Sequence, residues 1–430
     1  MKKQPALASP ITLPCGAVLP NRIAKAAMTE GLATMNGVPT PELERLYGLW
    51  SDGGAGMLLS GNIQIDRDHL EQPGNVIIDS EPGEDMAQAL ASWARTATRG
   101  GNHFWAQISH AGRQTPKNVN PHPKAPSAVP LELPGGRFGE PVELSEFEIH
   151  DIIRRFGIAA TACKKAGFTG VQIHSAHGYL LSQFLSPRAN KRTDRYGGKL
   201  RHRARVLLDV LKTIREAVGP DYPVAVKLNS ADFLKGGFAF EDSLQVAQWL
   251  EQGGIDLIEI SGGTYEQPKL VGIEGLEEEE AQEVKASTRM REAYFVDFAI
   301  AMQEQVSVPL MVTGGFRQRS VIEEAVKSGA ADVIGLGRPM CVDTDAPRQL
   351  LSGTSSLERY EDRLKGLPGW LSFLHQIAPV RVMAAFSTMY WFYAQLDELA
   401  RNGKPRPSMS VLGASHRILR RHARLLKSRG

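Results

Sequence analysis

The stretch that decides the fold contains Gly170-Val-Gln-Ile173 and Pro223-Val-Ala-Val-Lys-Leu228, with a helical pattern at Leu200–Val218 between them. The two short runs are rich in β-branched residues, as expected for strands of a parallel sheet that helices cover on both faces. Gly219 follows the helical pattern directly, and glycine is the usual residue where a helix ends. The stretch therefore predicts a strand–helix–strand unit.

The same unit repeats along the chain. Further strand-like runs are Arg22–Met28, Gly56–Ile65, His103–Ile108, Ile255–Ile260, Pro309–Thr313 and Asp332–Gly335. Helical patterns lie at Pro41–Asp52, Asp85–Arg99, Glu146–Ala166, Phe240–Gln252, Arg289–Gln305 and Ser320–Ser328. About eight strand–helix repeats without a second pattern predict an α/β protein, a (β/α)8 TIM barrel. An open doubly wound sheet would need a phosphate fingerprint after its first strand, and none is present.

The alternation stops near residue 345, so we expect a barrel over residues 1–345 and a C-terminal helical extension with a basic tail over residues 346–430. Pro368–Ala400 has a helical pattern that includes the aromatic stretch Met389–Tyr393, which is typical of a core or an interface. Ser415–Gly430 is rich in arginine, which favours a frayed basic helix over a membrane-surface segment. The long loops Ala111–Ser145 and Gly262–Ser287 follow strands, which places them at the active face.

Composition excludes several classes of protein. The 430 residues are 42% hydrophobic and 23% charged, and the net charge of +3 gives no reason to expect a nucleic-acid partner. Three cysteines without a Cys-x-x-Cys pair argue against a zinc ribbon or an iron–sulfur cluster. No signal peptide or transmembrane segment is apparent, so we expect a cytoplasmic protein.

The densest group of chemically active residues is His174-Ser-Ala-His177-Gly-Tyr179, at the carboxyl end of a predicted strand. On one helical turn, His174 and His177 would face the same point. Two imidazole N–H groups aimed at one oxygen can polarise a carbonyl, and Tyr179 is then a nearby general acid. The spacing fits two other interpretations, structural histidines and a pair of metal ligands.

Two glycine-rich turns follow the last two predicted strands. The first is Thr313-Gly314-Gly315 and the second is Gly335-Leu-Gly337-Arg338. In barrels, the loops at these positions often form a phosphate site, where glycine allows backbone N–H groups to approach the anion. Arg338 would add a charged fork, so the turns predict a phosphorylated ligand.

Other strand ends carry polar groups that suit a heterocycle. Gln107 ends the third strand and Ala27-Met28-Thr29 end the first. Lys227 alternates with Val226 in the fifth strand, which would put a cation inside the barrel and offset charge on an electron-accepting ring. An internal ion pair is the alternative for this lysine.

These residues identify a resemblance to the Old Yellow Enzyme family, also called the NADH:flavin oxidoreductase family, in a short, flavin-only form. The resemblance runs from about Pro10 to about Asp343. The motifs that carry it are Leu19-Pro-Asn-Arg-Ile23, Ala27-Met-Thr29, Gln107-Ile-Ser-His-Ala-Gly-Arg113, the His174–Gly198 block and Gly335-Leu-Gly-Arg338.

The resemblance implies FMN bound non-covalently at the carboxyl end of the barrel, with NADH or NADPH as the hydride donor. It implies an ene-reductase, which passes hydride to the activated C=C bond of an α,β-unsaturated carbonyl compound. His174 and His177 would hold the carbonyl oxygen, and Tyr179 would donate the proton. Small molecules are then the expected partners, and a homo-oligomer through Met389–Tyr393 is a candidate assembly.

The resemblance also assigns cofactor contacts. Expected FMN-binding residues are Ala27, Met28, Thr29, Asn62, Gln107, Lys227, Gly314, Gly315, Gly337 and Arg338. Three of these depart from the family pattern. Lys227 stands where many members have arginine, Ala27 where many have proline, and Asn62 where a small residue is common.

Other functions use the same residues. A flavin oxidoreductase acting on a nitro compound, a quinone or an amine would share the fold and the cofactor. A metal-dependent barrel hydrolase would use His174 and His177 as ligands, and a barrel without catalysis would serve as a binding protein.

Overall fold

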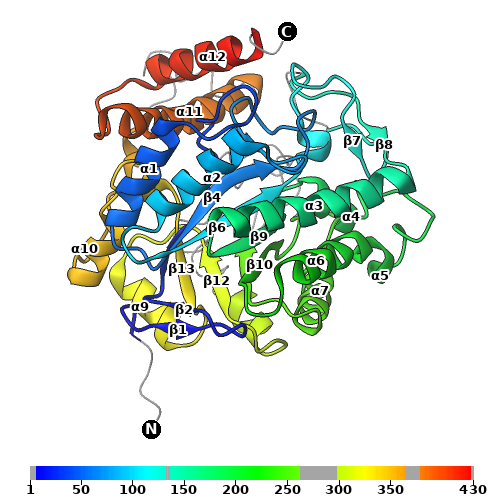
Figure 1. Cartoon of the computed structure of the whole chain (residues 1–430), viewed down its shortest axis with the longest axis horizontal. Coiled ribbons are helices and arrows are strands. Elements are labelled where there is room, and N and C mark those ends of the chain that lie inside the picture. The colour runs from blue at the N-terminus through cyan, green and yellow to red at the C-terminus, as the bar shows by residue number, and fades with distance from the viewer. Residues whose placement is uncertain (1–5, 132, 134–135, 262–297, 365–377, 428–430) are drawn as a thin grey trace.

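The computed structural model describes residues 6–131, 133, 136–261, 298–364 and 378–427. Within these residues, eight parallel strands close into a barrel, because β3 pairs with β13 on one side and with β4 on the other (Figure 1). The barrel strands are β3 (Ile23–Lys25), β4 (Met57–Gln64), β6 (His103–Ser109), β9 (Gly170–Ser175), β10 (Val224–Asn229), β11 (Leu257–Ser261), β12 (Leu310–Thr313) and β13 (Val333–Leu336). The predicted (β/α)8 barrel is confirmed.

The helices cover the outside of the barrel. They are α1 (Pro41–Asp52), α2 (Glu84–Ala97), α3 (Glu146–Ala166), α5 (Leu200–Arg203), α6 (Arg205–Val218), α7 (Phe240–Gln252) and α9 (Arg319–Lys327). The sequence located α1, α3 and α7 to the residue, and α3 shows why, since Ser145 forms a capping box and Gly167 adopts a left-handed C-cap. The single helix predicted over Leu200–Val218 is wrong in detail, because the helix is interrupted at Ala204 and forms α5 and α6.

Shorter elements lie in the loops. They are β5 (Val76–Ile77), η1 (Gly112–Gln114), the pair β7 (Lys124–Ala125) and β8 (Val142–Glu143), α4 (Leu180–Leu185), η3 (Arg338–Cys341), α10 (Ala346–Ser352) and η4 (Tyr360–Arg363). The predicted loop Gly262–Ser287 and most of the predicted helix Arg289–Gln305 lie outside the described residues.

A small antiparallel hairpin closes the amino-terminal end of the barrel. Its strands are β1 (Ile11–Thr12) and β2 (Val18–Leu19). Leu19 packs with inward-facing residues of the strands, among them Met57 and Trp105, in an apolar cluster inside this end. The polar chemistry is therefore confined to the opposite end, where the strands finish.

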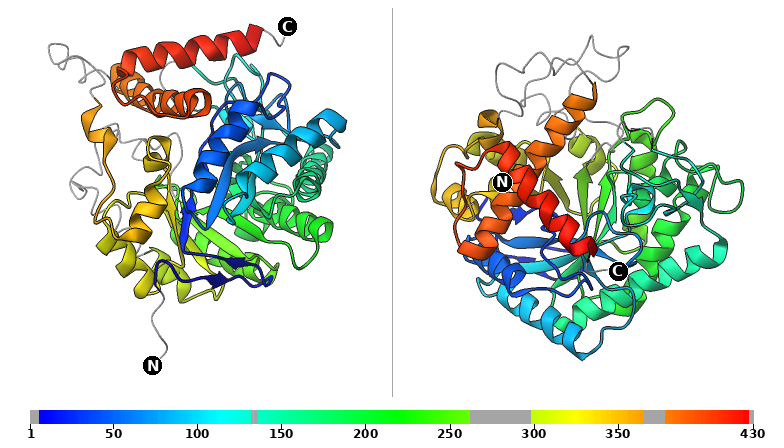
Figure 2. Two further views of the ribbon diagram at one scale, coloured as in Figure 1. Left: turned by 60° about the vertical axis from the view of Figure 1, so that its left-hand side comes forward. Right: turned by 90° about the horizontal axis from the view of Figure 1, so that it is seen from above.

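The C-terminal helix α11 (Ala378–Asn402) packs against α1, and α12 (Val411–Lys427) packs on α11, at the end of the barrel away from the hairpin (Figures 1 and 2). Tyr390, Trp391 and Phe392 are buried, so most of the aromatic stretch belongs to the core. The predicted C-terminal helical extension is confirmed, but its basic helix is not frayed over residues 411–427, because Asp397 anchors it through ion pairs with Arg417 and Arg421. No helix within the described ranges is both long and apolar enough to cross a membrane.

Truncation of Trp105 tests the contribution of the apolar cluster at the amino-terminal end of the barrel to stability. Because Trp105 is fully buried among the strands, Trp105→Ala should lower the stability by about 3–5 kcal/mol. The measurement is the midpoint of denaturant or thermal unfolding. Phe147→Ala is the matched control, since Phe147 is 81% exposed, and it should change stability by no more than ~0.5 kcal/mol. Equal effects would show that the cluster does not hold the barrel together.

Candidate active site

The histidine–tyrosine stretch forms a tight turn after β9. His174 is still on the strand, whereas His177 has a left-handed backbone, with φ of 60°. The backbone N–H of His177 donates to Oδ1 of Asn229, 3.1 Å away at the end of β10. Helix α4 begins only after Tyr179. The expectation that His174 and His177 share one helical turn is therefore wrong, because a strand and a turn stabilised by Asn229 arrange them instead.

The three side chains nevertheless converge. The ring centroid of His174 lies 5.2 Å from that of His177 and 4.8 Å from that of Tyr179. Nδ1 of His174 accepts the N–H of Ala176 at 3.3 Å, which leaves the proton of the neutral ring on Nε2. Nε2 of His177 lies 2.5 Å from Oγ of Ser261, at the end of β11.

Both histidines are neutral at physiological pH. Burial lowers the pKa of His174 well below its usual value, and the nearby His177 and Lys227 lower it further. Burial and Lys227 lower the pKa of His177 in the same way. Each ring therefore has one N–H and no charge, and His177 keeps its N–H for a ligand when the hydroxyl of Ser261 donates to its Nε2.

A continuous chain of hydrogen bonds crosses the polar end of the barrel interior. Nε2 of Gln107 donates to Oε1 of Gln172 at 2.6 Å, and Nε2 of Gln172 donates to Oε2 of Glu259 at 2.8 Å. Nζ of Lys227 lies 2.9 Å from Oε1 of Glu259. We call this set, Gln107, Gln172, Glu259 and Lys227, the inner polar chain. The internal ion pair considered for Lys227 is thus present.

Glu71, in the loop after β4, connects Tyr179 to a second group of polar side chains. The hydroxyl of Tyr179 donates to Oε2 of Glu71 at 2.6 Å, and Asn62 donates to the same oxygen. Thr29 also hydrogen-bonds this carboxylate. Oδ1 of Asn62 is buried and has no hydrogen-bond partner among the described residues. The expected FMN contacts Thr29 and Asn62 therefore lie beside the expected proton donor.

Met28 and Ala27, the remaining residues predicted at the end of the first strand, contact other parts of the barrel. Met28 Sδ is 3.4 Å from Sγ of Cys341, and Ala27 packs against the apolar cluster inside the barrel. Met28 therefore links the first strand end to η3, which follows β13.

The two glycine-rich turns are neighbours, as the sequence predicted. Thr313 on β12 pairs with Gly335 on β13, so the turns that follow these residues lie side by side. Gly314 and Gly315 have φ of 147° and 70°, values that favour glycine. Gly337 opens η3, and a Cβ built on it would meet nothing within 4 Å. Arg338 is half-exposed and lies 3.4 Å from Glu361.

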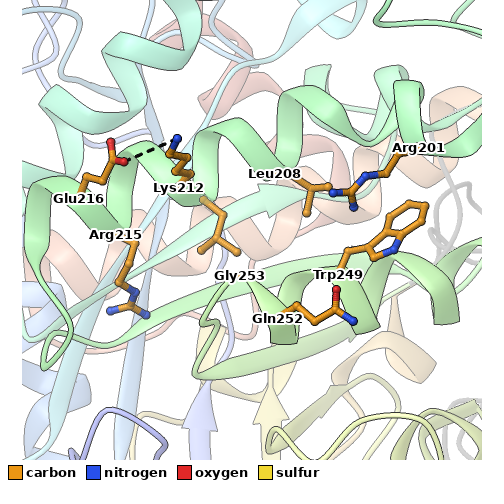
Figure 3. Close-up of a pocket in the computed structure, with 9 residues that line it drawn as sticks. Arg201, Leu208, Lys212, Arg215, Glu216, Trp249, Gln252 and Gly253 are labelled. Carbon is orange, nitrogen blue, oxygen red and sulfur yellow. Dashed lines mark ion pairs between the residues drawn. The ribbon is translucent and has the colours of Figure 1, made fainter.

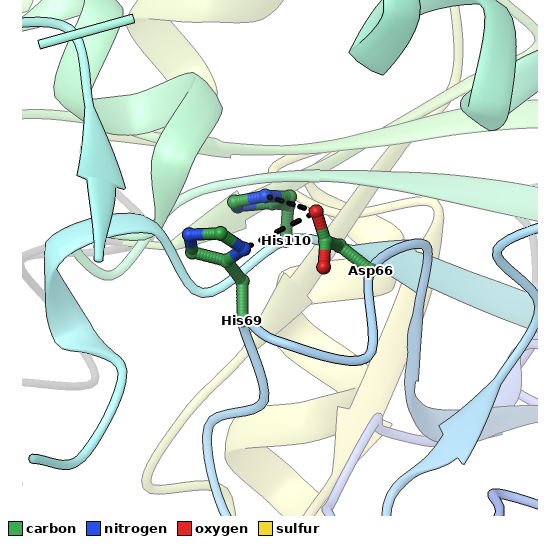
Figure 4. A group of neighbouring side chains, drawn as sticks. All are labelled: Asp66, His69 and His110. Atoms are coloured by element: carbon green, nitrogen blue, oxygen red, sulfur yellow. Dashed lines mark ion pairs between the residues drawn. The ribbon is translucent and has the colours of Figure 1, made fainter. Parts of the chain in front are cut away.

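A separate cluster, Asp66, His69 and His110, has atoms spaced as metal ligands would be (Figure 4). Nδ1 of His69 faces Asp66 at 3.2 Å, and Nε2 of His110 faces it at 3.8 Å. The opposite nitrogen of each ring accepts a backbone N–H, from Lys124 and Gly112 respectively. The nitrogens that face Asp66 therefore carry the protons of the neutral rings and have no lone pair for a metal.

The charges around this cluster agree with that assignment. Burial would raise the pKa of Asp66, but the facing rings of His110 and His69 hold it well below its usual range. Arg155 also lies 3.2 Å from the carboxylate. We conclude that the cluster is a structural clamp around an ionised Asp66.

A groove of about 340 Å³ lies elsewhere, between α6 and α7 on the outside of the barrel (Figure 3). Its lining includes Trp249 and the cations Arg201, Lys212 and Arg215. None of the residues predicted for the active site belongs to it.

Comparison with known proteins supplies the identity of the barrel. Residues 6–356 match the family model described as NADH:flavin oxidoreductase / NADH oxidase family. The chain belongs to this family. It is similar to the NADH-dependent flavin oxidoreductase iliE from Hypocrea jecorina (strain QM6a), with 36% identity over 359 residues, which cover 80% of this chain and 88% of the relative.

Two other similarities place the chain within the family. The NADH-dependent flavin oxidoreductase iliE from Neonectria sp. (strain DH2) is 36% identical over 81% of this chain, which spans about half of that relative, 47%. The solved structure of an Old Yellow Enzyme homologue from Zymomonas mobilis has a TM-score of 0.67 and 27% identity, covering 82% of this chain and 94% of that chain. The chain is thus an oxidoreductase of a family that binds FMN and uses NADH or NADPH as hydride donor.

The residues of the polar barrel end suit FMN. Oδ1 of Asn62 and Oγ1 of Thr313 are buried without a hydrogen-bond partner among the described residues, as groups that await a polar ligand would be. The paired turns at Gly314–Gly315 and Gly337 are only partly buried and lie next to Arg338, which suits a phosphate. Gln107 and Lys227 are buried, and their strands lie between the strand of Asn62 and that of Thr313 in the order around the barrel.

Sequence reasoning missed four polar residues of this site. Gln172 and Glu259 could have been found from residues that the sequence had already indicated. Gln172 lies two residues before His174, on the same face of β9. Glu259 on β11 is the register partner of Lys227 on β10. Ser261 lies two residues beyond Glu259 on the same face. Glu71 gave no such signal, since it lies in a loop without a periodic pattern.

The ion pair of the inner polar chain is buried, so removing one partner should be costly. Glu259→Ala should destabilise the protein by about 3–5 kcal/mol, because Lys227 would keep an uncompensated buried charge. Glu216→Ala is the control, as it removes one partner of the exposed pair with Lys212 and should cost no more than about 1 kcal/mol. Unfolding midpoints of the two variants provide the comparison, and similar losses would contradict the role of the buried pair.

The histidine clamp predicts a pH effect on stability. Burial lowers the pKa of His110 to about 4, from 6.5 for the unperturbed group. The contribution of neutral His110 is therefore complete above about pH 6.5 and is lost as the pH falls towards about 4. His110→Asn can still accept the N–H of Gly112 but does not titrate. Its melting temperature should fall less steeply than that of the wild type in this window, and parallel curves would refute the assignment.

Proposed function

We propose that the chain is an ene-reductase that reduces the activated C=C bond of an α,β-unsaturated carbonyl compound. The observation that carries this proposal is the convergence of two neutral imidazoles and one phenol, His174, His177 and Tyr179, at the polar end of the barrel. Two neutral N–H donors suit a carbonyl oxygen, whereas a phenol O–H suits the delivery of a proton to carbon.

The protein groups have distinct roles in this reaction. FMN held at this end of the barrel would supply the hydride, taken from NADH or NADPH. Nε2–H of His174 and a ring N–H of His177 hold the substrate carbonyl oxygen and draw electron density from the alkene, which makes the β-carbon electrophilic. Tyr179 donates its proton to the α-carbon. Neutral histidines can hold the carbonyl oxygen by hydrogen bonds without adding a charge of their own to the site.

The cofactor would be held by groups from several strand ends. Gly314, Gly315, Gly337 and Arg338 would bind the phosphate, and Ala27, Met28, Thr29, Asn62, Gln107 and Lys227 would contact the ring system. The inner polar chain fixes Gln107 and Lys227 before the cofactor arrives, which reduces the entropy that binding must offset.

The direct test is anaerobic. The enzyme is reduced with NADH or NADPH and mixed with 2-cyclohexenone, and the return of oxidised flavin absorbance is followed. The proposal predicts rapid reoxidation. If the enone fails while a nitro compound or a quinone reoxidises the flavin, the enzyme acts on one of those classes and the ene-reductase proposal is wrong.

Tyr179→Phe should separate the two half-reactions. Without the phenolic proton, reoxidation by 2-cyclohexenone should slow by about 10²-fold or more, because general acids contribute at least this much. Flavin reduction by the nicotinamide should stay within about 2-fold of the wild type, since it needs no proton from Tyr179. Stopped-flow absorbance measures both rates. Equal losses in the two half-reactions would contradict a proton-donor role.

A further inference from the structure

The carboxylate of Glu71 is the immediate neighbour of the proposed proton donor. Its Oε2 accepts the hydroxyl of Tyr179 at 2.6 Å. Glu71 comes from the loop between β4 and β5, and the tyrosine follows β9, so the contact joins two segments far apart in the sequence. Glu71 is half-buried, so part of this residue stays at the surface while its carboxylate contacts the tyrosine.

The surroundings of this carboxylate favour its neutral form. The side chains that hydrogen-bond it are Thr29, Asn62, Asn75 and Tyr179, all of them uncharged. Burial raises the pKa of Glu71, and these four hydrogen bonds offset only part of the rise. A carboxyl group in such a setting takes up a proton more readily than one that faces an arginine or a lysine.

The protonation state of Glu71 decides where the tyrosine proton points. An ionised Glu71 accepts from Tyr179 and holds the phenolic hydrogen away from a substrate. A protonated Glu71 can donate to the phenolic oxygen instead, which leaves the phenolic O–H available for the α-carbon of a substrate.

We propose that Glu71 is a proton relay that resupplies Tyr179 from solvent during alkene reduction. The inference rests on the proposed ene-reductase function. When the O–H bond of Tyr179 breaks and a C–H bond forms at the α-carbon, the phenolate takes the proton of the Glu71 carboxyl. The Glu71 carboxylate then takes a proton from a hydronium ion or a buffer acid in the solvent, which is the one proton that alkene reduction consumes overall. Glu71 acts through Tyr179 and is a positioning residue rather than a catalytic one.

Glu71→Gln tests the relay because the amide has the same size and keeps an acceptor oxygen but supplies no proton. We expect it to retain FMN and normal reduction by NADH or NADPH, while reoxidation by 2-cyclohexenone slows by about 10-fold or more. Glu71→Asp keeps an acid and should recover part of the rate. Glu81→Gln is the matched control, since Glu81 is exposed, and it should behave as the wild type in both half-reactions.

Infrared spectroscopy supplies a readout that is independent of turnover. At neutral pH the wild type should show the carbonyl stretch of a protonated carboxyl that disappears in Glu71→Gln and shifts in Glu71→Asp. If Glu71→Gln fails to fold, the shift in Glu71→Asp decides the assignment. The relay is overturned if the infrared band is the same in the variants as in the wild type. It is also overturned if Glu71→Gln is reoxidised at the wild-type rate. Failure of the wild type to react with 2-cyclohexenone instead overturns the ene-reductase proposal, and the infrared band still tests Glu71.

Discussion

The buried ion pair between Lys227 and Glu259 is the interaction on which the active end of the barrel depends. Two opposite charges inside a sheet are tolerated only when they are paired and their remaining hydrogen-bonding groups are satisfied. Here Glu259 also accepts from Gln172, which in turn accepts from Gln107, so the pair extends into a chain across four neighbouring strands. The apolar cluster around Trp105 fills the other end, and the two halves of the interior therefore differ sharply in polarity.

The second constraint is the turn that follows β9. His174 takes its position from the strand, whereas His177 depends on a left-handed backbone and on the side-chain oxygen Oδ1 of Asn229, at the end of β10. A non-glycine residue in this conformation costs free energy that the surrounding contacts must offset. The hydrogen bonds to Asn229 and Ser261 perform that task, and they hold the His177 imidazole beside that of His174.

The barrel could be predicted from sequence because each repeat carries a strand run, a helix pattern and a glycine stop, as at α3. The glycine turns at Gly314–Gly315 and Gly337 could be placed together because parallel strand ends meet at one face. The contact between Glu71 and Tyr179 could not, since an irregular loop has no period that fixes its side chains. The docking of α12 was also beyond prediction, because it depends on ion pairs between Asp397 and arginines such as Arg417, whose spacing in sequence is not regular.

The central claim is that the polar end of this barrel is built to hold FMN. The most direct measurement is the visible spectrum of the purified protein, followed by quantification of the flavin that denaturation releases. We predict the bands of an oxidised flavin and about one FMN per chain, as expected for a single barrel site. A colourless protein that gains no flavin absorbance after incubation with FMN would contradict the account, and stoichiometric zinc in that protein would point to the histidine pair as metal ligands.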